Sequence, residues 1–159
     1  MLIYKKLLRN LLKIKCERSM KSSFSHGIKL RVRYSETDQM GYCYYGNYAS
    51  YFEVGRVEAL RSLGMSYKSL EEEGIMLPVS HFEVDYRSPA FYDDELSITT
   101  RIVETAGARL FFEYDIHNDA GKLISQAKTT LVFVNKATMR PIPAPERFLS
   151  LIGSHAVRD

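Results

Sequence analysis

Long apolar segments are absent from this sequence of 159 residues, because charged side chains interrupt every run before the roughly 18 apolar residues that a membrane-crossing helix needs. Cysteine is scarce as well. Cys16 and Cys43 lie in different contexts and form neither a metal-spaced pair nor a disulfide framework. These absences argue against integral membrane association, a bound metal and a disulfide scaffold, and they favour a cytoplasmic location.

Positive charge is concentrated at the N-terminus. Residues 1–27 carry seven Lys and Arg residues against one acid, Glu17, which gives them a net charge of +6, whereas the whole chain carries +3. The remainder is therefore slightly acidic, at −3. A nucleic-acid partner selects a basic stripe on the folded domain, and the remaining cations are scattered instead. We do not expect nucleic-acid binding.

The N-terminal extension, residues 1–27, supports two interpretations. Its leucine and isoleucine residues interleave with cations, as in a basic amphipathic helix that lies on a membrane surface. Alternatively, Met20 is an internal start, and residues 1–19 are an upstream extension of an over-long gene prediction. We favour the second interpretation, because the segment precedes the first predicted strand. The domain itself is predicted over residues 28–152.

The rest of the chain fits one domain, since 45% hydrophobic residues in a chain of this length can bury a core. Apolar and polar residues alternate over residues 28–35, which predicts a half-buried strand with Tyr34 on its apolar face. Residues 36–46 break this period and form a loop. Apolar side chains then recur at helical spacing, which predicts a helix over residues 47–63. A short second helix is predicted over 66–73, with a serine as its cap.

Beyond Gly74 the period changes to two. Four strands are predicted, the last three as antiparallel neighbours with short connections, and their ranges are 81–87, 95–104, 109–117 and 123–134. A terminal helical turn is predicted over 146–152. This order predicts an α+β fold, in which an antiparallel β-sheet wraps around one long central helix. The open edges of such a sheet favour a homodimer formed by sheet extension.

The loop between the first strand and the helix is the segment richest in polar residues that could carry chemistry. Asp38 lies in this loop, together with Gly41 and Gly46, which let backbone approach a ligand closely. The first N–H groups of a helix have no intrahelical partner and carry partial positive charge, so they can hold a carbonyl oxygen as negative charge develops on it. An acid beside such a helix start can therefore serve an acyl-transfer reaction.

This segment resembles the signature of the 4-hydroxybenzoyl-CoA thioesterase family of hotdog proteins, and it is similar to the Tol-Pal-associated bacterial thioesterases. The signature has a Tyr, an Asp four residues later, then Gly, Tyr and a helix-opening Asn-Tyr. The matching residues are Tyr34, Asp38, Gly41, Tyr44, Asn47 and Tyr48. The resemblance continues through Tyr86-Arg87-Ser88-Pro89-Ala90 and covers about residues 28–150. It implies a hotdog fold and the hydrolysis of acyl-CoA thioesters to free acid and coenzyme A.

By this resemblance Asp38 is the catalytic carboxylate. It acts either as a nucleophile through a mixed anhydride or as a general base on water, and both routes stay open. The backbone N–H of Tyr45, with Gly46 beside it, polarises the thioester carbonyl. Several bacterial members carry His where this chain has Tyr45, a difference that leaves a backbone role intact but removes a histidine proton relay.

The resemblance also implies which residues bind the substrate. In the loop and at the helix start they are Tyr34, Gly41, Tyr44, Asn47 and Tyr48. The phosphates of coenzyme A need cations, for which Arg87 is the first candidate, and the weaker candidates are Arg101, Arg109 and Lys136. No metal or redox cofactor is implied, since coenzyme A is part of the substrate.

Two further side chains near this segment receive structural interpretations. Glu53 is a rival catalytic acid on the helix, but Arg56 follows three residues later, and this spacing favours an intrahelical ion pair. Cys43 neighbours the site but has no nearby histidine that would activate a thiol, so we interpret it as a small apolar filler.

The main functional hypothesis is an acyl-CoA thioesterase that works as a homodimer or homotetramer. A first alternative is a thioesterase that acts on acyl groups carried by an acyl carrier protein. A second is a non-catalytic hotdog module that binds acyl ligands. A dehydratase of the same fold ranks third, because the sequence shows no histidine-containing active-site motif for that proton transfer.

Overall fold

The structure, a computed structural model, describes residues 19–156. The two interpretations of the N-terminal extension concern residues that lie mostly outside this range, so they stay predictions, as does the domain boundary at residue 28. The described part of the extension forms strand β1 (Ser19–Lys21) and the start of β2 (Ser25–Arg31). Met20 pairs with Thr105 and packs against the core, so residues 19–27 contribute to the sheet.

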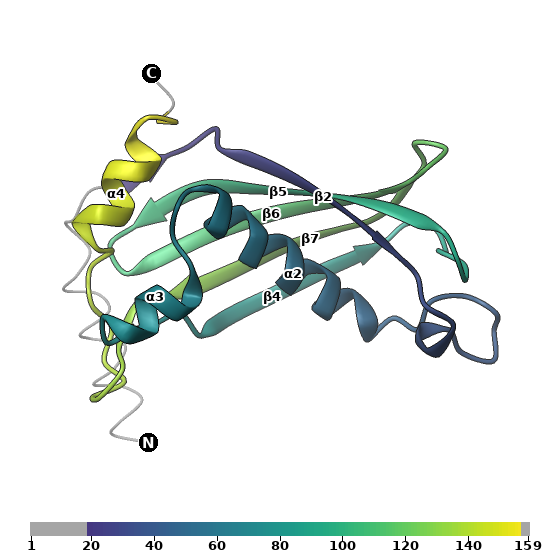
Figure 1. The fold of residues 1–159 in the computed structure, drawn as a ribbon, viewed down its shortest axis with the longest axis horizontal. Coiled ribbons are helices and arrows are strands. Elements are labelled where there is room, and N and C mark those ends of the chain that lie inside the picture. The colour runs from purple at the N-terminus through teal and green to yellow at the C-terminus, as the bar shows by residue number, and fades with distance from the viewer. Residues whose placement is uncertain (1–18, 157–159) are drawn as a thin grey trace.

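A six-stranded antiparallel sheet forms the body of the protein (Figure 1). Its order is β1-β5-β6-β7-β4, and β2 also pairs with β5. The remaining strands are β4 (Val79–Tyr86), β5 (Glu95–Ala106), β6 (Arg109–Asn118) and β7 (Leu123–Val132). A separate pair is formed by β3 (Ile75–Met76) and β8 (Val134–Asn135). The four strands predicted after Gly74 are confirmed, including the antiparallel pairing of the last three.

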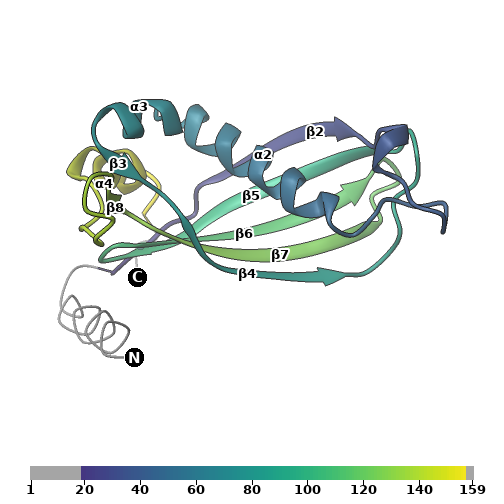
Figure 2. The same cartoon turned by 90° about the horizontal axis from the view of Figure 1, so that it is seen from below.

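Helix α2 (Asn47–Ser62) runs along one face of the sheet, which curves around it (Figure 2). Helix α3 (Tyr67–Glu72), capped by Ser66, and helix α4 (Glu146–Gly153) lie near the C-terminal end of α2 (Figure 1). The predicted helices and the predicted α+β hotdog architecture are therefore confirmed. Within residues 19–156, every helix falls short of the length and apolarity that a bilayer crossing requires.

The central helix packs closely on β5 because of one glycine. A Cβ atom at Gly55 would lie 2.7 Å from Thr100 Oγ1 and 3.2 Å from Ile98 Cγ2, both on β5. Glycine inside a helix costs about 1 kcal/mol relative to alanine. Here its small size permits a contact that a larger residue would prevent, and this contact brings the middle of α2 close to β5.

The first predicted strand differs from the observed one. It begins three residues earlier, at Ser25, and ends at Arg31, because residues Tyr34–Glu36 form a turn of 3-10 helix, η1. The alternation predicted Tyr34 on the apolar face, but this side chain is 78% exposed. The periodicity continued past the end of the strand, into residues that hydrogen bond locally instead.

Candidate active site

The loop that contains Asp38 is closed on itself between η1 and α2 (Figure 1). The Tyr44 N–H donates to the Glu36 carbonyl at 2.8 Å, and the Asp38 N–H donates to the Tyr42 carbonyl at 3.1 Å. Gly41, at φ +80°, closes the turn by donating its N–H to the Asp38 carbonyl at 3.0 Å. The loop is thus a short, hydrogen-bonded excursion that returns the chain to the start of α2.

Asp38 lies partly exposed within this loop. Its Oδ1 accepts a hydrogen bond from the Met40 N–H at 2.8 Å. Among residues 19–156, no cation lies within ion-pair distance of the carboxylate, and its other oxygen has no hydrogen-bond donor. One oxygen is therefore oriented by the backbone, and the other is available to a substrate or a water molecule.

The start of α2 supplies two available donors. The Asn47 N–H donates to the Tyr44 carbonyl at 3.0 Å, and the Tyr48 N–H donates to the Tyr45 carbonyl at 3.3 Å. The N–H groups of Tyr45 and Gly46 have no acceptor anywhere in the described part of the chain. These N–H groups lie at the positive end of a 16-residue helix, so they can hold a developing oxyanion.

Aromatic side chains surround this helix start. The Tyr86 hydroxyl, from the end of β4, donates to the Tyr45 carbonyl at 3.1 Å. The Tyr86 ring lies 5.3 Å from the ring of Tyr48, and the Tyr44 and Tyr45 rings lie 4.5 Å apart. Burial raises the pKa of Tyr48, so this phenol is neutral at physiological pH. Sequence reasoning missed the Tyr45–Tyr86 contact, which joins residues 41 positions apart.

Of the predicted substrate-binding residues, Gly41 and Tyr44 lie in the closed loop, and the others lie outside it. Asn47 and Tyr48 lie in the first turn of α2, where the Asn47 side chain donates to the Glu36 carbonyl at 2.8 Å. Tyr34 lies farther out, with its ring edge-on to that of Tyr92 at 5.6 Å. Arg87 follows Tyr86 at the end of β4, and its guanidinium is exposed and 3.4 Å from Asp85.

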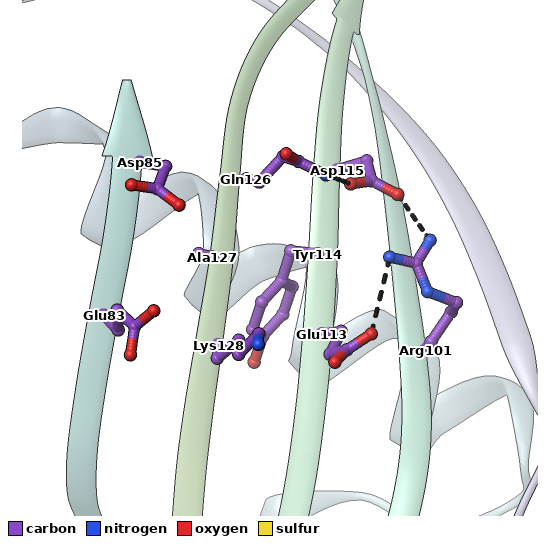
Figure 3. A pocket seen from close by; sticks show the side chains of 9 residues that line it. All are labelled: Glu83, Asp85, Arg101, Glu113, Tyr114, Asp115, Gln126, Ala127 and Lys128. Atoms are coloured by element: carbon purple, nitrogen blue, oxygen red, sulfur yellow. Dashed lines mark hydrogen bonds and ion pairs between the residues drawn. The ribbon is translucent and has the colours of Figure 1, made fainter. Parts of the chain in front are cut away.

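The weaker cation candidates do not lie together. Arg101 forms an ion pair with Asp115 at 2.6 Å, on the face of the sheet opposite α2 (Figure 3). Lys136 lies beside α3, with its ammonium 3.4 Å from the Glu71 carbonyl. Arg109 is the first residue of β6 and pairs with Ala106, at the end of β5. Of the four predicted cations, Arg87 is the one that follows a residue bonded to the helix start.

The predicted ion pair between Glu53 and Arg56 is wrong. Arg56 is 8% exposed and donates from Nε to the Tyr67 hydroxyl at 2.8 Å, with its guanidinium 6.0 Å from the centre of that ring. No ion pair joins it to Glu53 or to any other described acid. Arg56 points to α3, which a spacing rule within one helix does not take into account. The prediction that Cys43 is a small buried residue is confirmed, since it is 2% exposed.

Glu36 is the residue that sequence reasoning missed. Its carboxylate is buried and accepts from the Arg33 N–H, from the Arg33 guanidinium and from the Tyr51 hydroxyl. Burial alone would raise the pKa of Glu36, but these hydrogen bonds outweigh it and hold the pKa below its ordinary value. A usable signal was present, because Arg33 precedes Glu36 by three residues, the spacing of a capping box.

A cavity of about 310 Å³ lies on the other face of the sheet (Figure 3). Its lining includes acids from β4 and β6, together with Arg101 and Lys128. Within this lining, Arg101 pairs with Asp115 at 2.6 Å and with Glu113 at 4.0 Å. The cavity contains none of the predicted catalytic residues, so we do not assign the chemistry to it.

Comparison with known proteins shows which family this chain belongs to. The family described as the thioesterase-like superfamily matches residues 32–152. A putative acyl-CoA thioesterase of Bacillus subtilis, YneP, is 34% identical over 76% of this chain and 87% of its own. The acyl-CoA thioester hydrolase YbgC of Escherichia coli is 32% identical over 76% of this chain and 90% of its own. The crystal structure of a DHNA-CoA thioesterase from Staphylococcus aureus superposes with a TM-score of 0.78, at 31% identity, over 82% of this chain and 89% of that one.

Proposed function

The chain belongs to the thioesterase-like superfamily and is an acyl-CoA thioester hydrolase, and we propose that Asp38 carries the hydrolysis while the N–H groups of Tyr45 and Gly46 stabilise the oxyanion. The observation that supports this proposal best is the juxtaposition in the closed loop. A carboxylate with one free oxygen and two N–H groups without acceptors flank the same hydrogen-bonded excursion between η1 and α2.

In the general-base route, Asp38 accepts a proton from a water molecule as the water oxygen bonds to the thioester carbon. The electron pair of the C=O bond moves to the oxygen, which the N–H groups of Tyr45 and Gly46 hold. The C=O bond then re-forms and the C–S bond breaks. Coenzyme A leaves as a thiolate and takes up the proton that Asp38 had accepted.

In the nucleophilic route, a carboxylate oxygen of Asp38 attacks the thioester carbon and expels the thiolate of coenzyme A. The product is a mixed anhydride, which water hydrolyses to the free acid and the regenerated carboxylate. Both routes use the same two N–H groups and require an ionised Asp38. Neither route uses a metal or a redox cofactor.

The enzyme acts as a homodimer through β4 in this proposal. The side chains of Phe82 and Tyr86 contact α2 from β4, yet they are 42% and 51% exposed. Strand β4 is also an edge strand, with β7 as its one partner among the described strands. Edge strands with exposed apolar side chains are templates for pairing with another chain. A second β4 would extend the sheet and cover these rings, and a homotetramer would add a second contact of a different kind.

Coenzyme A places three phosphates near the opening of the site in this proposal, and Arg87 is the cation that contacts them. It lies one residue after Tyr86, which is bonded to the start of α2. A cytoplasmic location is also part of the proposal, since the sequence has two cysteines and Cys43 is a free, buried thiol.

The test is an assay of thiol release by purified protein from short, long and aromatic acyl-CoA substrates, with Asp38→Asn as the variant. We expect turnover of at least one substrate and a fall in kcat of about a hundredfold or more in the variant. Undiminished release by the folded variant would contradict the role of Asp38 and turn attention to Glu53. If the protein hydrolyses acyl groups on a carrier protein but not on coenzyme A, its substrate is the acyl carrier protein thioester.

A further inference from the structure

Glu36 joins two segments that the proposed mechanism needs to keep in a fixed relation. Asp38 lies two residues after it, and the donors at Tyr45 and Gly46 follow Tyr44, which hydrogen bonds to it. The loop between them contains the exposed residues Gln39 and Met40. Without a fixed point, such a loop would let the carboxylate move relative to the oxyanion donors.

The backbone of Glu36 fixes the side of the loop that leads into α2. Its carbonyl accepts from the Tyr44 N–H at 2.8 Å and from the Asn47 side chain at 2.8 Å. Asn47 is the first residue of α2. One carbonyl oxygen therefore ties the end of the loop and the first turn of the helix to the residue that precedes Thr37 and Asp38.

The side chain of Glu36 fixes the residue itself to the core. Oε2 accepts from the Arg33 N–H at 2.8 Å and from the Tyr51 hydroxyl at 2.6 Å, and Oε1 accepts from the Arg33 guanidinium at 2.7 and 2.9 Å. Tyr51 is 4% exposed and lies on α2, one turn beyond Asn47. The carboxylate thus joins η1 to the buried side of the helix with charge-assisted hydrogen bonds, which are stronger than neutral ones.

We infer that Glu36 is a positioning residue, which holds the Asp38 carboxylate and the N–H groups of Tyr45 and Gly46 in register through Tyr51 and the loop hydrogen bonds. This inference rests on the proposed function. Glu36 does not touch the substrate, since its carboxylate is buried and fully occupied by Arg33 and Tyr51. A displacement of about 1 Å between reacting groups can cost about a hundredfold in rate, so the loss of this support acts on kcat.

The chain offers a matched pair of variants for the test. Tyr51 and Tyr114 are both buried, at 4% and 1% exposure, and each hydroxyl makes a hydrogen bond to a residue 15 positions away. The partner of Tyr51 is Glu36, at 2.6 Å, whereas the partner of Tyr114 is Thr129 in the sheet, at 2.8 Å. Tyr51→Phe and Tyr114→Phe remove the same atom from the two networks, and one of these networks reaches the loop.

We expect Tyr51→Phe to lower kcat on acyl-CoA by about tenfold and Glu36→Gln to lower it by about a hundredfold, with KM changed by less than about threefold in both. Tyr114→Phe should keep kcat within about twofold, although its melting temperature should fall by a few degrees, as in Tyr51→Phe. Equal kcat losses in Tyr51→Phe and Tyr114→Phe, or unchanged kcat in folded Glu36→Gln, would overturn the inference.

Hydrogen exchange of the Asp38 and Tyr44 N–H groups tests the inference without reference to activity. Their protection should fall in Tyr51→Phe and Glu36→Gln and stay unchanged in Tyr114→Phe. Unchanged protection in all three variants would overturn the positioning role. A wild-type protein that releases no thiol from any acyl-CoA would contradict the proposed function instead, and the exchange experiment would still decide whether Glu36 holds the loop.

Discussion

The two faces of the sheet differ in how their polar groups are paired. On the face away from α2, residues from four strands stand in register as Glu83, Lys128, Glu113 and Arg101, and the cavity there is lined by charges of both signs. On the α2 face, the closed loop leaves one oxygen of Asp38 and two backbone N–H groups without partners.

We therefore rank unpaired donors and acceptors above a hollow as a guide to the site of the chemistry. Ion pairs on an exposed sheet face contribute about 0–1 kcal/mol each to stability, and a charged group within such a pair already has a partner. Unpaired N–H groups at a helix start are available for a substrate, and they act on charge that develops during a reaction. The active site is therefore expected at the start of α2, although the cavity of about 310 Å³ lies elsewhere.

The largest expected effect comes from a matched pair of carboxylates on the two faces. Asp38→Asn should lower kcat by about a hundredfold or more, because the amide can neither accept the proton nor attack the thioester. Asp115→Asn, on the other face, should keep kcat within about twofold. Steady-state thiol release measures both variants, and an equal loss in the two would remove the distinction between the faces.

The next largest effect is expected when an exposed ring of β4 is replaced, compared with a residue on the opposite face of the same strand. Phe82→Arg places a cation where a second β4 would pack, so it should dissociate the dimer and lower activity by about tenfold. Glu83→Arg, one residue along on the other face, should leave the molecular mass unchanged. Light scattering at micromolar concentration reports the mass, and a wild-type monomer would contradict the proposed dimer.

A smaller effect is expected for the binding of coenzyme A. Arg87→Met should raise the KM for acyl-CoA by about fivefold with kcat unchanged, as removal of an exposed cation–phosphate contact of about 1 kcal/mol predicts. Arg101→Met, which removes a guanidinium paired with Asp115, should change KM by less than about twofold. A rise in KM in Arg101→Met with no rise in Arg87→Met would show that coenzyme A lies beside Arg101 instead.

The smallest effect concerns stability at low pH. The folded protein holds the pKa of Glu36 and of Asp115 below their ordinary values, since hydrogen bonds from Arg33 and Tyr51, and from Arg101 and Gln126, outweigh burial. The unfolded chain therefore takes up protons first as pH falls, and the stabilisation present above about pH 4 is lost below it.

Urea unfolding between pH 6 and pH 3 measures this loss. Glu36→Gln and Asp115→Asn should each flatten the pH dependence of the free energy of unfolding, because each removes a carboxyl group whose pKa is lowered in the folded protein. A dependence as steep as that of the wild type in both variants would show that other carboxyl groups control acid unfolding.

Much of the fold could be predicted from local patterns. Period-two alternation after Gly74 located β4 to β7 within a few residues, and helical spacing located α2 to within one residue of its end. The pattern failed at Tyr34, where alternation continued but the chain turned into η1, because the Arg33 N–H donates to the Glu36 carboxylate and this local bond decided the backbone. It also missed β1, because three residues are too few to show an alternating pattern.

The candidate site could be located from the sequence but not assembled from it. The spacing of Asp38, Gly41 and the helix start could be recognised from the sequence, because these residues are close in the chain. The contact of Tyr86 with Tyr45 and the support of Glu36 by Tyr51 join segments 41 and 15 residues apart. The partner of Arg56 was likewise decided by α3, not by spacing within α2.

By itself, the sequence determined the α+β architecture, the position of Asp38 before a helix and the resemblance to thioesterases, because periodicity and short spacings report burial and local geometry. The tertiary structure alone decided which polar groups remain unpaired. Pairing depends on register and on side chains brought together from distant segments, as at Glu36, so the same residue types are satisfied on one face of the sheet and available on the other.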